Sequence, residues 1–76
     1  MKIQDIKLEE IDKGYFVITA TQTKINFLGC ITEIKKVYLN PFFRWDCEVH
    51  SHRMRDKKEA QTICNVMYIL NIKRLF

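Results

Sequence analysis

Turn-forming residues are scarce in this chain, which has only two glycines and one proline among its 76 residues. We therefore expect no flexible linker, and the sequence shows no internal repeat or low-complexity segment. A chain of this length supports one small domain, residues 1–76, with a modest core. The hydrophobic fraction is 47%, with five Phe, three Tyr and one Trp, which indicates a folded core and not a disordered tail.

Long apolar runs and paired cysteines are also missing. No window approaches the ~18 apolar residues of a membrane span, and Lys2 and Asp5 interrupt what would be the apolar part of a secretory signal. The cysteines Cys30, Cys47 and Cys64 are odd in number and widely spaced, which argues against a disulfide framework. We expect no membrane partner, a cytoplasmic location and buried, reduced thiols.

Charge is unevenly distributed along the chain. Residues 1–12 hold two basic and four acidic residues, whereas 11 basic and five acidic residues follow. The densest basic segment, residues 50–58, contains Arg53, Arg55, Lys57 and Lys58 against Asp56 alone. Such a segment either attracts phosphates or an acidic protein surface, or is simply solvated.

Period-two patterns predict strands over residues 15–21, 25–31, 35–39 and 43–52. A turn is expected at residues 22–24, a bulge or a close backbone approach at Gly29, and a second turn at Asn40 and Pro41. Residues 1–12 fit either a short strand or a helical turn, and residues 32–39 fit either a strand or a helix, of which we favour the strand. Neighbouring strands would pair in antiparallel fashion.

The clearest alternation lies in residues 43–52. One parity holds the core candidates Phe43, Trp45, Cys47 and Val49. The other parity would form a solvent-exposed face of mixed charge, made of Arg44, Asp46, Glu48, His50 and His52. Mixed signs on one face suit a protein partner better than a phosphate backbone, so we assign partner binding to this face.

A long C-terminal helix is expected to start at Asp56, which is a good N-cap with Glu59 three positions on. Its core stripe is Ala60, Ile63, Cys64, Met67 and Leu70. A second apolar set is formed by Ile69, Ile72 and Phe76. Either residues 72–76 fold back as a strand, or this second set meets another protein or a second copy of the chain.

Cys47, His50, His52 and Cys64 are residue types that bind zinc at such spacings, and a cysteine close to a histidine could also act in catalysis. If residues 43–52 form a strand, Cys47 faces the core and both histidines face solvent, which opposes a shared centre. No nucleophile motif, phosphate-binding glycine loop or carboxylate pair is present. We therefore expect no metal site, no cofactor and no enzymatic activity.

Residues 53–61, RMRDKKEAQ, resemble the strand-to-helix junction of two families: the double-stranded RNA-binding domain and the arm-binding domain of phage integrases. In the first family, the positions matching Lys57, Lys58 and Gln61 would grip phosphates. The chain as a whole is similar to small orphan proteins of bacteriophages and mobile elements, including anti-CRISPR inhibitors of host nucleases. This resemblance implies a binding protein and assigns no functional residues.

The sequence thus predicts an α+β domain, with a three- or four-stranded antiparallel sheet and one long C-terminal helix packed on one face. The expected function is non-enzymatic binding to a host protein, as a phage-type modulator or inhibitor would act. The alternative is nucleic-acid binding through the basic segment at residues 53–58.

Overall fold

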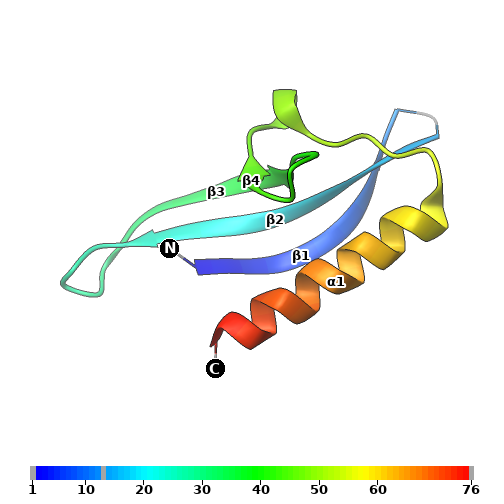
Figure 1. The fold of residues 1–76 in the computed structure, drawn as a ribbon. Helices are drawn as coiled ribbons and strands as arrows, with labels where there is room; N and C mark the ends of the chain where they lie inside the picture. The colour runs from blue at the N-terminus through cyan, green and yellow to red at the C-terminus, as the bar shows by residue number, and fades with distance from the viewer. Residues whose placement is uncertain (1, 13, 76) are drawn as a thin grey trace.

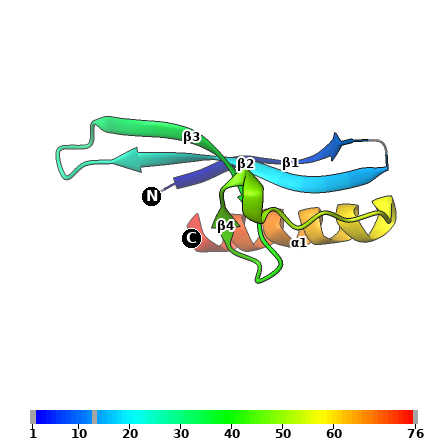
Figure 2. The same cartoon turned by 90° about the horizontal axis from the view of Figure 1, so that it is seen from above.

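The computed structural model describes residues 2–12 and 14–75. Its elements are β1 (Lys2–Ile11), β2 (Tyr15–Ile25), β3 (Ile31–Leu39), β4 (Trp45–Asp46), a short 3-10 helix η1 (Glu48–His50) and α1 (Lys57–Leu75). The strands form one antiparallel sheet in the order β1-β2-β3-β4, and α1 lies across one face of it (Figure 1, Figure 2). The predicted α+β fold with a four-stranded sheet and one C-terminal helix is confirmed.

The opening segment and residues 32–39 are both strands, which settles the two alternatives that the sequence left open. β1 carries a bulge between Gln4 and Lys7, where Asp5 adopts a left-handed φ of 54°. Bulges of this kind bend a strand and increase its twist. The bend lets β1 follow the curled sheet.

The β2–β3 turn lies later than the sequence predicted. The prediction of a turn at residues 22–24 is wrong, because β2 continues to Ile25 and the chain reverses over residues 26–30. The Asn26 side chain accepts hydrogen bonds from the backbone N–H groups of Leu28 and Cys30, both at 3.0 Å. Gly29 lies in this turn with φ 83°, and so does not mark the bulge that was expected there.

Helix α1 begins as predicted, since the Asp56 carboxylate accepts a hydrogen bond from the Lys58 N–H at 2.9 Å. Its buried face includes Ala60, Cys64 and Met67. The helix continues to Leu75, which rules out the alternative of a final strand. Leu70 is exposed, so its place in the predicted core stripe is wrong.

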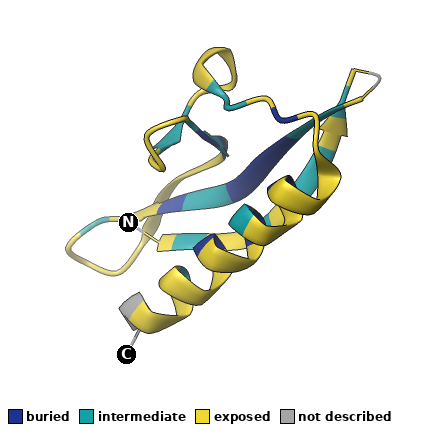
Figure 3. Cartoon of the chain, turned by 45° about the vertical axis from the view of Figure 1, so that its right-hand side comes forward, coloured by how far each residue is buried: buried dark blue, intermediate teal, exposed yellow. Residues whose placement is uncertain are grey.

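The core lies between α1 and the sheet. Its buried cluster comprises Ile18, Leu39, Met54, Ala60, Cys64 and Met67. Burial is greatest in the middle of β2 (Figure 3). The segment that leads into α1 closes one end of the core, because Met54 and Phe16 exchange backbone hydrogen bonds of 2.7 and 2.9 Å.

The far end of the β2–β3 hairpin projects beyond the rest of the molecule (Figure 1). β1 starts opposite Thr23, so residues 24–31 lie past its end. The molecule is consequently elongated, with extents of 43 × 26 × 18 Å.

Candidate functional site

The predicted strand over residues 43–52 is wrong, because only Trp45 and Asp46 pair with β3. The Asn40 side chain accepts hydrogen bonds from the N–H groups of Phe42 and Arg44, at 3.0 and 2.9 Å. Phe43 takes a left-handed φ of 59°, which no regular strand allows. Side chains that hydrogen-bond the local backbone compete with extended structure, and here they override the alternation.

After Asp46 the chain turns into η1 instead of continuing the strand. The N–H of His50 donates to the carbonyl of Cys47 at 3.1 Å. As a result Cys47 and Val49, expected in the core, are exposed, whereas Trp45 packs against the core as predicted.

Three side chains with metal-binding atoms meet at this turn. Asp46, Cys47 and His50 each place one such atom within 4.8 Å of the other two. The Nδ1 of His50 lies 3.1 Å from an Asp46 carboxylate oxygen. The parity argument that separated Cys47 from His50 is therefore wrong, because it depended on a strand that does not form.

The Asp46 carboxylate is held by three neighbours. The Cys47 N–H donates to one oxygen at 2.7 Å, and His50 and the Asn40 amide contact the other at 3.1 and 3.3 Å. These contacts, led by the Cys47 N–H, lower the pKa of Asp46 to about 2. The group is therefore ionised at neutral pH.

The remaining members of the predicted partner-binding face do not form one strand face. Arg44 precedes β4, Glu48 lies in η1, and His52 follows it with its N–H bonded to the Leu39 carbonyl at 2.9 Å. Among the described residues, neither His52 nor Cys64 joins Asp46, Cys47 and His50 in a group of close ligand atoms. Cys64 is buried on α1.

The four basic residues of the alternative site are exposed around the start of α1. Two of them already have partners: Arg53 lies 3.9 Å from Asp12, and Arg55 stacks on the Tyr15 ring and donates to its hydroxyl. That hydrogen bond raises the pKa of Arg55, so its charge is retained. Lys57 and Lys58 form the first turn of α1.

The second apolar set on α1 is only partly described. Ile69 and Ile72 are exposed, together with Val66 and Tyr68. Phe76, which the sequence placed in this set, lies outside the described residues.

A further group of exposed apolar side chains is one that the sequence did not reveal. It lies on the projecting hairpin and is here called the hairpin patch: Ile25, Phe27, Leu28, Ile31 and Ile34. Phe27 is 96% exposed and Leu28 is 72% exposed. The sequence signal is an apolar run with few charges, which predicted a strand over residues 25–31. That prediction is wrong, because residues 26–30 form the turn between β2 and β3.

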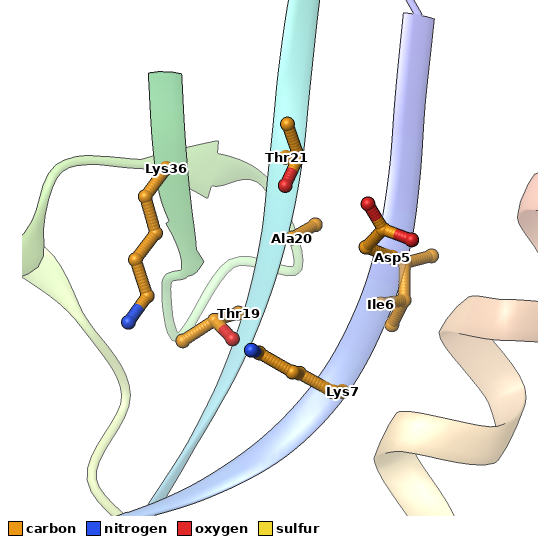
Figure 4. A pocket seen from close by; sticks show the side chains of 7 residues that line it. All are labelled: Asp5, Ile6, Lys7, Thr19, Ala20, Thr21 and Lys36. Atoms are coloured by element: carbon orange, nitrogen blue, oxygen red, sulfur yellow. The ribbon is translucent and has the colours of Figure 1, made fainter. Parts of the chain in front are cut away.

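The sheet face opposite α1 contains an open hollow of about 480 Å³ beside the β1 bulge (Figure 4). Lys36 on β3, which lines the hollow, forms a 2.7 Å ion pair across β2 with Glu9 on β1, and Lys7 lies 3.7 Å from Glu9. Lys36 lowers the pKa of Glu9 and Glu9 raises that of Lys36. Because both lysines are already engaged, we assign no ligand to the hollow.

Thr19 lies fully buried beneath this ion pair. Its hydroxyl is close enough to Glu9 to lower the carboxyl pKa slightly, yet it makes no hydrogen bond of normal geometry to any described residue.

No protein-family model, no curated protein and no solved structure matches this chain. In the part of the chain that the structure describes, α1 lacks the run of apolar residues that a membrane-crossing helix needs. The class defined by the fold is a small α+β domain with an exposed apolar hairpin.

Proposed function

We propose that this chain is a small non-enzymatic binding protein that occupies a partner protein through the hairpin patch. The observation that carries the proposal is the exposure of five large apolar side chains on one projecting hairpin. Contiguous apolar surface is costly in water and on a folded domain commonly marks an interface. Phe27 and Leu28, at the tip, are suited to act as anchors that fill a pocket.

The hairpin also offers an unpaired strand edge. Among the described residues, β4 pairs only with Tyr38 and Leu39, so the outer edge of β3 has no neighbouring strand from residue 31 to 37. An extended segment of a partner can add to such an edge through main-chain hydrogen bonds. Backbone pairing and apolar anchoring would then act on the same hairpin.

The charge beside the hairpin patch indicates which side chains the partner's segment carries. In the sheet register Ile34 lies opposite Thr23, and Thr23 lies opposite Lys2, so Lys2 shares a face with the patch. We therefore expect a partner segment with apolar side chains flanked by Asp or Glu.

The phage-type part of the proposal, a modulator or inhibitor of a host protein such as a defence nuclease, is supported by the sequence resemblance alone. The face once expected at residues 44–52 is replaced by the hairpin patch as the principal contact. The exposed Ile69 and Ile72 on α1 remain a candidate surface for a second copy of the chain.

The test is an affinity capture from a bacterial lysate, treated with nuclease and run at low and high salt. Baits are the wild type, a Phe27→Asp/Leu28→Asp variant, and a Phe42→Asp control, whose side chain is also exposed but lies in the β3–β4 loop. The proposal expects one stoichiometric protein that survives high salt, is kept by the control and is lost by the hairpin variant. Capture that is unaffected by the hairpin variant overturns it, and so does sedimentation showing that the patch serves only self-association.

Nucleic-acid binding remains the second candidate, supported by the exposed cluster of Arg53, Arg55, Lys57 and Lys58. Binding through phosphates falls steeply with salt. In the same capture, recovery of nucleic acid alone, lost at high salt and in a Lys57→Glu/Lys58→Glu variant, would favour this function.

A further inference from the structure

We propose that Asp46, Cys47 and His50 form a binding site for a divalent transition-metal ion of the zinc type. This inference does not depend on the proposed function, because the three residues lie at the β4–η1 turn and outside the hairpin patch.

The spacing of the ligand atoms fits tetrahedral coordination. Bonds of about 2.0–2.1 Å to nitrogen and oxygen place two such ligands about 3.3 Å apart around one ion. The His50 nitrogen and the Asp46 oxygen are 3.1 Å apart. A metal ion would replace the proton that these two atoms share, with little movement of either side chain.

The thiol needs only a small adjustment. A sulfur ligand lies about 3.6 Å from its neighbours in a zinc tetrahedron, and the Cys47 sulfur is within 4.8 Å of the other two atoms. Cys47 is exposed, so its side chain can rotate without disturbing the core.

The site is anchored by the fold. Asp46 belongs to β4 and pairs with Tyr38, while the Cys47 N–H and the Asn40 amide hold its carboxylate. Outer hydrogen bonds of this kind orient metal ligands and raise affinity. His50 is fixed relative to Cys47 by the 3-10 turn between them.

The donor set selects the ion. Thiolate, imidazole and carboxylate together suit zinc or cobalt, whereas magnesium and calcium prefer oxygen ligands alone. With three protein ligands, one position of a tetrahedron stays open to water or to a group from a partner.

The experiment is a titration of the reduced protein with Co²⁺, followed by the thiolate-to-cobalt charge-transfer absorption and by competition with Zn²⁺. Two matched pairs of variants are available: Cys47→Ser against Cys30→Ser, both exposed cysteines, and His50→Gln against His52→Gln. Circular dichroism checks that each variant is folded.

We expect one Co²⁺ per chain, displaced by Zn²⁺ and not by Mg²⁺. The absorption should disappear in Cys47→Ser, and binding should weaken at least about tenfold in His50→Gln. Cys30→Ser and His52→Gln should bind as the wild type does. Absence of the band in the wild type, its persistence in Cys47→Ser, or its loss in Cys30→Ser would each overturn the proposal.

Discussion

Two asparagines build equivalent five-residue turns in this small protein. Asn26 and Asn40 each accept two backbone N–H groups through the side-chain oxygen, at residues two and four positions later. The fourth residue of each turn has a positive φ, which is Gly29 in the first turn and Phe43 in the second. Only glycine adopts that backbone without cost.

Phe43→Gly should raise the free energy of unfolding by about 1 kcal/mol, because a non-glycine residue at positive φ costs about 1–2 kcal/mol and this side chain is mostly exposed. Gly29→Ala should lower it by a similar amount, since an added Cβ meets no atom within 4 Å and only the backbone is strained. Urea unfolding measures both. A less stable Phe43→Gly would mean that the phenyl ring contributes packing.

The three thiols should differ in reactivity. Cys30 and Cys47 are exposed, whereas Cys64 is buried and its burial raises the pKa of the thiol. A chromogenic disulfide reagent should modify two cysteines rapidly and the third only after unfolding. Cys64→Ala should abolish the slow phase, and three equally fast thiols would contradict the described packing of α1.

At the scale of elements, the start of α1 depends on its cap. Asp56→Ala should lower the free energy of unfolding by about 1 kcal/mol, because the Lys58 N–H loses its acceptor. Asp56→Ser keeps a capping oxygen and should retain most of the stability. Thermal or urea unfolding of the pair measures the difference, and equal stability of Asp56→Ala and wild type would contradict the cap.

The ion pair between β1 and β3 should make stability depend on pH. The pKa of Glu9 is lower in the folded protein than its usual value, chiefly through Lys36, so its contribution is present above about pH 4.3 and is lost as pH falls through the folded pKa. Lys36→Met should flatten this acid dependence in urea midpoints measured between about pH 3 and pH 7. The control Lys35→Met loses only a 3.9 Å pair with Glu33 and should leave the acid dependence of stability unchanged.

The elements differ in how far the sequence determined them. The start of α1 and the β2 strand were predictable because their signals are local: a capping aspartate and a run of β-branched and aromatic residues. The strand over residues 43–52 was predicted wrongly, because alternation says nothing of the hydrogen bonds that Asn40 and Asp46 make to the backbone. The grouping of Asp46, Cys47 and His50 was missed because of the same error.

At the scale of the whole molecule, a single helix cannot cover the entire sheet. α1 packs on β1 and β2, and the far end of the β2–β3 hairpin extends past the end of β1. The β2–β3 hairpin patch is therefore left outside the core although its residues look like core residues in the sequence. To distinguish patch residues from core residues in the sequence, one would need to know where β2 ends, and local composition does not determine that.

The measurement that most directly tests the central claim is hydrogen–deuterium exchange of this protein, alone and with its captured partner. The account predicts new protection at residues 25–37, on the hairpin patch and the open edge of β3. Unchanged exchange there, with protection appearing instead at the start of α1 or over residues 44–52, would contradict it.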